Sequence, residues 1–367
     1  MKNTYGHNIS ITLFGESHGS EIGAVLDGLA PGIKIDEEFI RQQLSLRRPS
    51  GNISTARVEE DDFRIVSGAF EGYTTGAPLC ILIPNENTRS KDYSKTKDLA
   101  RPGHADFAAR CKYHGFEDYR GGGHFSGRIT APIVAAGAIL ISALKEKGIF
   151  IGTHISSLAG IKDANFSANR LAEDINKLSL SEFAVLDSNA GEEMKKAIIA
   201  AKMDCDSVGG ILETAVIGTP SGVGEPWFDS VESMISHAMF SIPAIKGVEF
   251  GDGFAMADMR GSEANDPFRM EEGRAVTLTN HNGGVNGGIT NGMPIVFRCA
   301  VKPTPSIFKA QETVDMAKGE NAELLLEGRH DPAIIHRARV VVDSMTAFVI
   351  ADLLTGRYGT DFLKTER

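Results

Sequence analysis

The sequence has 367 residues, with 38 Lys and Arg against 48 Asp and Glu, so its formal net charge is −10. This acidic total excludes a non-specific nucleic-acid binder, which needs excess basic side chains to hold the phosphate backbone. Hydrophobic residues make up 42% and charged residues 23%, near the globular average, which excludes a disordered or fibrous chain. Residues 41–128 nevertheless hold 10 arginines and 4 lysines against 11 acidic residues. This local excess of positive charge indicates a small anionic ligand.

Short β-branched or aromatic runs bounded by Gly, Pro or Asp predict strands at residues 9–14, 24–26, 63–67, 79–83, 149–155, 211–217 and 295–301. Apolar periodicity predicts helices at residues 128–147, 192–203, 231–239 and 332–354, and one ending near Leu46. Strands and helices do not alternate regularly. The pattern therefore favours the α+β class over a doubly wound fold.

The predicted helix at 128–147 has small residues at 135–138, which let another element approach its backbone closely. A second long helix of this kind in the other half hints at an internal pseudo-repeat, although the sequence shows no period. The polar stretch 163–189 is the best candidate for a domain boundary, but it holds apolar residues at helical spacing. We therefore expect one integrated domain over residues 1–367.

The cysteines lie far apart and form no Cys-x-x-Cys pair; they are Cys80, Cys111, Cys205 and Cys299. They indicate buried, reduced thiols rather than a zinc site or a disulfide framework. The N-terminus lacks an apolar signal-peptide core. The most apolar later stretch, residues 129–144, is shorter than the ~20 residues needed to span a bilayer. We expect a cytoplasmic chain without a membrane segment.

Two common classes of site are excluded because the chain has no Gly-x-x-x-x-Gly-Lys-Ser/Thr and no His-Glu-x-x-His. A dinucleotide fold is disfavoured as well, since Ser126 stands where the fingerprint after Gly121 and Gly123 needs its third glycine. What remains is a set of polar loops that carry histidine and arginine.

Three polar loops carry a histidine. His18 directly follows a predicted strand, His104 lies between an arginine and an aspartate, and His330 precedes the helix that Pro332 opens. Histidine donates or accepts a proton near neutral pH, so these loops suit general acid–base catalysis. Asp331 is well placed to cap the helix that follows it.

The arginines supply groups that bind phosphate and carboxylate bidentately. Those near predicted helix ends or glycine turns are Arg47, Arg48, Arg120, Arg128 and Arg329. Helix N-termini add partial positive charge to such an anion site. Arg57 and Arg64 lie beside the acidic residues 59–62 and are expected to belong to an ordinary surface.

These segments, taken together and in order, resemble the chorismate synthase family from residue 15 to about residue 340. The matching segments are Gly15–Gly19, Asp27-Gly28, Arg47-Arg48-Pro49, Arg101–Asp106, Tyr119–Gly123, Ser126–Ala131, Lys246–Glu249, Asn280-His281, Gly287-Gly288, Lys302–Ser306 and Gly328–Pro332. The resemblance implies conversion of 5-enolpyruvylshikimate 3-phosphate into chorismate, an anti-1,4-elimination of phosphate with loss of a ring proton. It also implies a need for reduced FMN without net redox change. The implied fold is a β-α-β sandwich, with helices packed between antiparallel sheets, assembled as a homotetramer.

The resemblance also implies roles for individual residues. His18 would protonate the departing phosphate, and His104 would protonate or charge-balance the reduced flavin. Asp331 would assist flavin N5 in taking the ring proton. The residues implied as substrate-anion ligands are Arg47, Arg48 and Arg128. Those implied around FMN are His124, Phe125, Ser126, Ala244, Gly287, Lys302, Pro303, Thr304, Pro305, Ser306 and Arg329.

Two departures from the family pattern matter. Many relatives have Arg-Ser where this chain has His124-Phe125, and some carry a second arginine where this chain has Ile53. The second departure argues against a nicotinamide site, so we expect a monofunctional chain that receives reduced FMN from an external flavin reductase. Two alternatives stay open at this point. They are a flavin-dependent oxidoreductase acting on another anionic metabolite, and a non-catalytic binder of phosphorylated metabolites.

Overall fold

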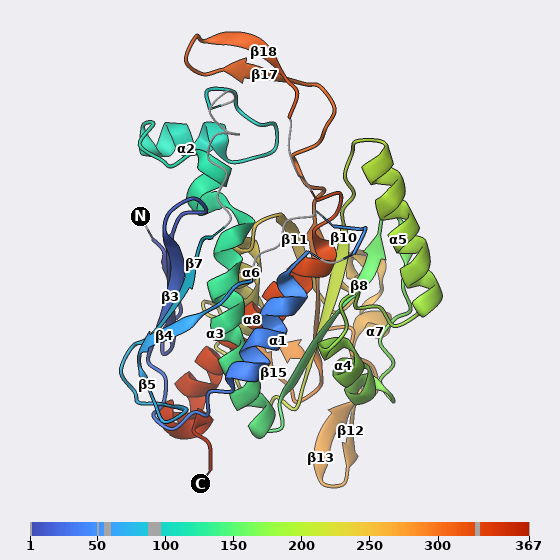
Figure 1. The fold of residues 1–367 in the computed structure, drawn as a ribbon. Helices are drawn as coiled ribbons and strands as arrows, with labels where there is room; N and C mark the ends of the chain where they lie inside the picture. Colours follow the sequence, from blue (N-terminus) through green and yellow to red (C-terminus); the bar gives the residue numbers. More distant parts are fainter. Residues whose placement is uncertain (1, 50, 55–59, 87–96, 327–330, 367) are drawn as a thin grey trace.

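The computed structural model describes residues 2–49, 51–54, 60–86, 97–326 and 331–366. Two five-stranded antiparallel sheets enclose a layer of helices (Figure 1). The first sheet has the order β1 (Thr4–Tyr5), β2 (Ser10–Gly15), β3 (Glu21–Asp27), β7 (Leu79–Pro84) and β4 (Arg64–Ser67). The second has the order β11 (Ile245–Phe250), β16 (Ile295–Val301), β10 (Gly210–Ile217), β8 (Phe150–Leu158) and β9 (Ile161–Lys162).

The helices between the sheets are α1 (Glu37–Arg47), α3 (Thr130–Glu146), α6 (Val231–Ser241) and α8 (Ile335–Tyr358). Helix α3 contacts β3 and β7 of the first sheet, α8 contacts β8 and β10 of the second, and the two helices pack on each other. This layering confirms the expected β-α-β sandwich of the α+β class. The seven predicted strands and the predicted helices are all present, with ends that differ by a few residues.

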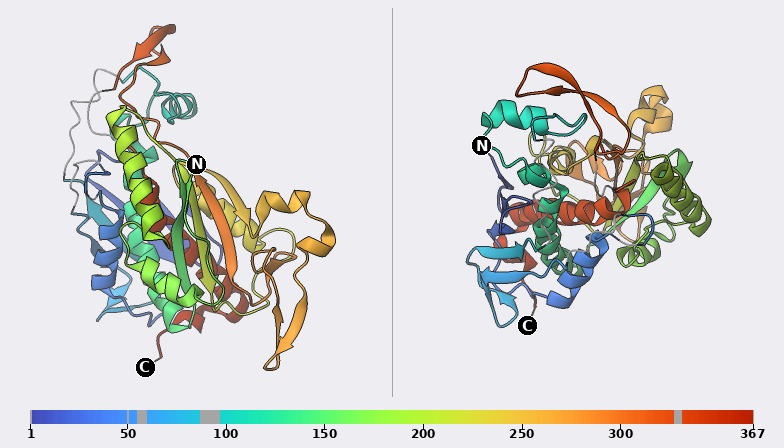
Figure 2. Two further views of the ribbon diagram at one scale, coloured as in Figure 1. Left: turned by 90° about the vertical axis from the view of Figure 1, so that its right-hand side faces the viewer. Right: turned by 45° about the horizontal axis from the view of Figure 1, so that its top comes forward.

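The remaining helices and hairpins lie outside the two sheets and the helical layer (Figure 2). The helices are α2 (Asp106–Tyr113), α4 (Leu171–Ser179), α5 (Ser188–Met203) and α7 (Gly261–Ala264). The hairpins are β5–β6 (Ala69–Phe70, Tyr73–Thr74), β12–β13 (Phe268–Glu271, Arg274–Thr277), β14–β15 (Val285–Asn286, Ile289–Thr290) and β17–β18 (Gln311–Asp315, Glu320–Leu324). Helix α4 lies in the polar stretch considered as a boundary, and it packs on β8.

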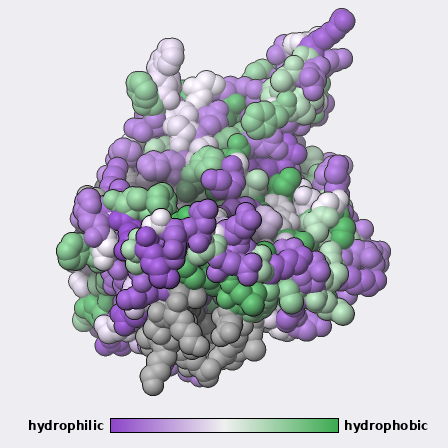
Figure 3. Space-filling model, turned by 90° about the horizontal axis from the view of Figure 1, so that it is seen from above, coloured by the Kyte–Doolittle hydropathy of each residue, from purple (hydrophilic) through white to green (hydrophobic). Residues whose placement is uncertain are grey.

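One end of the molecule carries helix α2 and the hairpin β17–β18. Helix α2 and the hairpin β17–β18 lie side by side at the top of Figure 1. The hairpin hydrogen-bonds to the segment before α2, through Ala100 N to Val314 O at 3.3 Å and Met316 N to Asp98 O at 2.8 Å. Seen from above in Figure 3, this end is largely hydrophilic, with smaller apolar patches among the polar residues.

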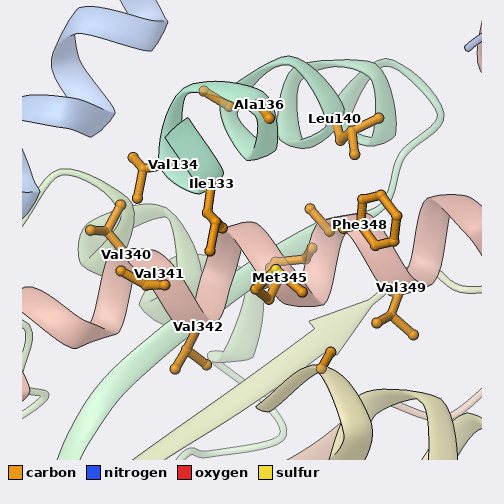
Figure 4. Close-up of a cluster of buried hydrophobic side chains, with 14 of the residues drawn as sticks. Ile133, Val134, Ala136, Leu140, Val340, Val341, Val342, Met345, Phe348 and Val349 are labelled. Atoms are coloured by element: carbon orange, nitrogen blue, oxygen red, sulfur yellow. The ribbon is translucent and has the colours of Figure 1, made fainter. Parts of the chain in front are cut away.

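The contact between α3 and α8 forms the centre of the core (Figure 4). Both helices bury nearly all their side chains. A Cβ built on Gly137 of α3 would lie 2.3 Å from the Ser344 Cβ of α8, so no larger residue fits there. The close approach expected from the small residues of α3 is therefore present, and it fixes the distance between the two sheets.

The helix that contains the apolar residues 129–144 is longer than that stretch. Gly127–Glu146 is a continuous helical segment of 20 residues, which by length and composition alone could cross a membrane. However, 83% of its apolar window is buried inside the chain. The stretch is accounted for by its packing on α8, β3 and β7, as in the core helix of a globular protein.

Candidate active site between two histidine loops

A glycine turn, Gly121–Gly123, packs against both of the histidines singled out above. Gly121 and Gly122 have φ values of +59° and +82°, a region that glycine adopts without strain. A Cβ on Gly121 would lie 2.2 Å from His18 Cε1, and one on Gly122 would lie 3.2 Å from His104 Cε1. The two imidazoles therefore lie against adjacent residues of one turn, although they are 86 positions apart in the sequence.

His18 is buried just beyond the end of β2, as its position after a strand predicted. The loop is held by a backbone hydrogen bond from Ser17 N to Gly123 O at 3.1 Å. The Ser17 hydroxyl is buried and has no hydrogen-bond partner in the part of the chain that the structure describes. Such a buried polar atom indicates a group that a ligand can satisfy.

The segment Gly15–Gly19 also fits the Gly-x-Ser-x-Gly pattern of α/β-hydrolase nucleophiles, which needs a strand, a sharp turn and then a helix. Here the element that follows is β3, a strand that pairs antiparallel with β2. The Ser17 side chain is buried rather than raised above a sheet. The hydrolase interpretation therefore does not hold.

His104 is oriented by a carboxylate that the sequence analysis did not assign to the site. Its Nδ1 lies 2.9 Å from Asp106 Oδ1, and Arg101 donates to both carboxylate oxygens of Asp106 at 2.7 Å. Burial alone would raise the pKa of Asp106, but the bonds from Arg101 and His104 outweigh it and hold that pKa well below its usual range. Arg101 Nη2 also lies 3.1 Å from His104 Nδ1, so Arg101, His104 and Asp106 form one cluster. The sequence signal that could have identified Asp106 as a partner of His104 is the spacing Arg-x-x-His-x-Asp.

Arg47 and Arg128 lie together, and the same carboxylate binds both. Asp61 accepts from Arg47 Nη1 at 3.2 Å through Oδ2 and from Arg128 Nη1 through Oδ1. The arginine side chains are 4% exposed and that of Asp61 is 0% exposed. The acidic residues 59–62 are thus not all at the surface, and the anion-binding edges of both arginines carry an internal carboxylate.

The other arginines differ in their surroundings. Arg48 is partly buried, and its Nε has no hydrogen-bond partner among residues that the structure describes. Arg64 is largely exposed and pairs with Glu21, as expected for a surface residue. Arg120 is held by Asp118, with Nε–Oδ1 at 2.8 Å. Arg57 lies outside the described residues.

Two segments of the expected FMN surround meet the His104 loop. Lys302 Nζ donates to the Gly103 carbonyl, and a Cβ on Gly103 would lie 3.3 Å from Pro305 Cβ. Lys302 N also donates to Ala244 O at 3.0 Å. The structure thus brings Lys302 and Pro305 to the loop of His104, and Ala244 is bonded to the backbone of Lys302. The Thr304 hydroxyl is buried without a hydrogen-bond partner among the described residues.

His124, Phe125 and Ser126 continue the glycine turn and use their side chains locally. His124 Nδ1 donates to the Gly15 carbonyl at 2.8 Å, and the Phe125 ring meets Tyr113 edge-on at 6.0 Å between centroids. Ser126 Oγ accepts from the Arg128 backbone N–H at 3.3 Å. These residues lie at the glycine turn, but their functional groups already have protein partners.

Gly287 is not brought to the histidine loops by any contact given for the described chain. It lies in the β14–β15 hairpin, whose Gly288 carbonyl accepts from Val231 N at 3.0 Å, at the start of α6. Ala244 follows the opposite end of this 11-residue helix, which is about 16 Å long at 1.5 Å per residue. Arg329 and His330 lie outside the described residues.

The expected capping role of Asp331 is wrong. Helix α8 begins at Ile335, and Ile334 occupies the N-cap position without a side-chain bond. The Asp331 carboxylate forms an ion pair with Arg337 instead, and Arg337 Nε donates to the Arg47 carbonyl at 2.7 Å. The attraction of a guanidinium outweighs that of the neutral N–H groups of a helix end.

No group of His, Cys, Asp and Glu side chains within the described ranges could hold a metal ion. All four cysteines are free thiols, but the expectation that they are buried is wrong for Cys111 and Cys205, which are exposed. The site is therefore built from histidines, arginines, glycines and two carboxylates, Asp106 and Asp331, with Asp61 behind it.

Comparisons with known proteins agree on one family. The family model for chorismate synthase matches residues 9–355. Chorismate synthase from Pyrococcus abyssi is 46% identical over 352 residues, which is 96% of this chain and 97% of that protein. The protein of this name from Chitinophaga pinensis is 47% identical and covers 96% of each chain. A crystal structure of chorismate synthase matches with a TM-score of 0.77 and 31% identity, over 97% of this chain and 94% of that one.

Proposed function

The chain belongs to the chorismate synthase family, and from this premise we propose which of its residues carry out the reaction. Enzymes of this family are carbon–oxygen lyases. They eliminate phosphate from 5-enolpyruvylshikimate 3-phosphate to give chorismate, the last step of the shikimate pathway, and use reduced FMN without net redox change. The observation that carries our assignment is the glycine turn against which both His18 and His104 pack.

His18 acts as the general acid for the leaving phosphate in this proposal. The C–O bond breaks more easily when a proton reaches the departing oxygen, and imidazole is the side chain best suited to deliver it near neutral pH. The Ser17 hydroxyl beside it is buried without a partner in the described chain, so a substrate oxygen would satisfy it. Gly121 leaves the ring in place because it has no Cβ.

His104 stabilises negative charge on the far side of the same turn. Its Nδ1 faces the ionised Asp106 carboxylate, which Arg101 fixes through two hydrogen bonds. This carboxylate orients the imidazole, as in other pairs of histidine and aspartate. His104 is thereby suited to protonate or charge-balance an anionic ligand.

The substrate carries a phosphate and two carboxylates, and we assign their binding to Arg47, Arg48 and Arg128. Arg48 has an unpartnered Nε among the described residues. Arg47 and Arg128 meet at the buried carboxylate of Asp61. Buried guanidinium groups attract an anion strongly because water screens them little.

The described residues fit the reduced FMN that the family uses. The groups that support this fit are the Thr304 hydroxyl, which is buried without a partner among the described residues, and the Lys302 ammonium beside Gly103. The residues that would hold the cofactor are His124, Phe125, Ser126, Ala244, Gly287, Lys302, Pro303, Thr304, Pro305, Ser306 and Arg329. When bound, reduced FMN supplies electron density to the allylic system of the substrate. The residues of the chain would orient the cofactor and transfer protons. Asp331 is the carboxylate that we propose assists removal of the ring proton.

We also propose a cytoplasmic homotetramer of single-domain chains, supplied with reduced FMN by an external flavin reductase. Large aromatic side chains are exposed on the chain, among them Trp227, Phe228 and Phe254. Exposed aromatic residues are typical of surfaces that another protein covers. Sedimentation equilibrium of the purified protein tests the tetramer, and a monomer would contradict it.

The decisive experiment measures phosphate release from 5-enolpyruvylshikimate 3-phosphate without oxygen, with and without reduced FMN. Turnover that requires reduced FMN but leaves it reduced supports the proposal. Flavin oxidation equal to product formation would instead identify an oxidoreductase. Turnover with oxidised FMN and NADPH alone would contradict the requirement for an external reductase.

A further inference from the structure

We propose that Arg337 is a positioning residue for the elimination, which ties the Asp331 carboxylate to the substrate-binding segment that begins at Arg47. The inference rests on the proposed roles of Asp331 and Arg47. It concerns a residue to which neither the motifs nor the proposed reaction had given a role.

The guanidinium of Arg337 divides its donors between two partners from different parts of the chain. Its Nη1 pairs with Asp331 Oδ2, and its Nε donates to the Arg47 carbonyl at 2.7 Å. Arg47 ends α1, whereas Asp331 belongs to the segment before α8. The guanidinium is planar and rigid, so two such bonds fix the distance and the angle between their acceptors.

The neighbouring residue of α8 holds the other end of the same segment. His336 Nε2 lies 2.9 Å from Ser54 Oγ. Burial, and then the nearby charge of Arg337, lower the pKa of His336 to about 3, so the ring is neutral in this contact. Lys202 adds a bond to Asn52 O at 2.8 Å.

The first turn of α8 therefore holds both Arg47, which directly precedes Arg48, and Ser54, a few residues after it. The helix itself is 24 residues long and almost wholly buried between the two sheets, so it provides a rigid base. The proposed proton-handling carboxylate, Asp331, and the proposed anion-binding residue Arg47 are thereby both held in position by α8. Such placement matters because a shift of ~1 Å in a reacting group can cost about 10²-fold in rate.

The test compares Arg337→Gln, Arg337→Lys, Asp331→Asn and the double variant Asp331→Asn/Arg337→Gln. Arg357→Gln is the matched control, because Arg357 is an exposed arginine near the other end of the same helix. Turnover, KM for the substrate and Tm are measured for each variant with reduced FMN present. Control turnover should equal that of the wild type.

We expect Arg337→Gln to lower kcat about 30-fold or more, with KM raised less than kcat is lowered. Arg337→Lys keeps the charge but cannot reach both acceptors, so its loss should be smaller, about 5- to 10-fold. The double variant should lose less than the product of the two single losses, since part of the effect of Arg337 acts through Asp331. A merely structural role would give additive losses and a lowered Tm in both backgrounds.

The inference is overturned if Arg337→Gln turns over at the wild-type rate while Asp331→Asn is impaired, or if the two losses are additive. If Arg337→Gln does not fold, Arg337→Lys replaces it in the cycle, and a wild-type rate there has the same meaning. Failure of the proposed function looks different, because Asp331→Asn would then itself turn over normally.

Discussion

Asp61 forms an ion pair with Arg128 in which neither side chain is more than 4% exposed. Arg47 shares the same carboxylate, so the two arginines assigned to substrate anions already hold an anion of the chain itself. Asp61 has a φ of +52°, a backbone conformation that a residue other than glycine adopts only when its surroundings favour it. The carboxylate keeps two like charges side by side in the absence of ligand.

Asp61→Asn should lower the free energy of unfolding by about 3–5 kcal/mol, the usual effect of removing one partner from a buried ion pair. Inorganic phosphate should then raise the Tm of the variant more than that of the wild type, because the added anion takes the place of the carboxylate. Thermal unfolding with and without phosphate measures both effects. Asp62→Asn is the control, since Asp62 is adjacent but exposed. Equal phosphate shifts in Asp61→Asn and the wild type would mean that this arginine pair does not bind external anions.

His18→Ala and His104→Ala should each lower kcat about 10²-fold or more, the usual scale of a general acid or base. Steady-state phosphate release with reduced FMN gives the rates. His114→Asn is a suitable control because His114 is exposed and has a φ of +61°, which asparagine tolerates. Rates near wild type in both alanine variants would remove the assigned roles and favour a non-catalytic binder.

Gly121→Ala should abolish most turnover, because the new Cβ would meet His18 Cε1 at 2.2 Å and must displace the ring. The matched control is Gly115→Ala. Gly115 also has a positive φ, +81°, but a Cβ there would meet nothing within 4 Å. Both variants carry backbone strain of roughly 1–2 kcal/mol, so their difference in kcat reports the displacement of His18. Equal rates in the two variants would show that the turn does not set the position of the imidazole.

Asp106→Asn should lower kcat, by about 10²-fold if the orientation of His104 is lost. It should also change how stability depends on pH. The pKa of Asp106 is depressed in the folded chain, so its contribution is present above the unfolded value of about 4 and is lost as the pH falls through the folded value. The Tm gap between wild type and variant should therefore be largest near neutral pH and narrow on acidification below about pH 4. A gap that is constant with pH would mean that the charge of Asp106 contributes nothing.

The parts of the fold that depend on local pattern could be predicted from the sequence. The strand predicted at 295–301 is β16 with the same ends, and the helix predicted at 128–147 contains α3. Two-residue strands such as β1 were not predicted, because they depend on pairing with a distant partner rather than on their own composition. Helix α8 continues four residues past the predicted end and stops at Gly359, whose φ of +90° lies outside the helical region.

The site was predictable in its residue types but not in its contacts. His18 and His104 could be selected because histidine in a polar loop has a recognisable chemistry. The burial of Asp61 could not be inferred from the sequence, because a run of four acidic residues is typical of an exposed segment, and its neighbours Glu60 and Asp62 are indeed exposed. Asp331 was assigned to a helix end because the preference of aspartate for that position is local. Its observed partner, Arg337, lies six residues further along the chain in α8, where the Arg47 carbonyl at the end of α1 accepts from the same guanidinium.

The position of α8 between the sheets has a consequence for how the chain acquires its structure. Every strand of both sheets precedes α8 in the sequence, and the inner faces of β8 and β10 rest on this helix. Translation proceeds at about 5–20 residues per second, so these apolar faces stay uncovered for many seconds before their partner leaves the ribosome. The nascent chain is therefore expected to depend on chaperones until residue 358 is free, and to lose solubility when its synthesis is interrupted before α8.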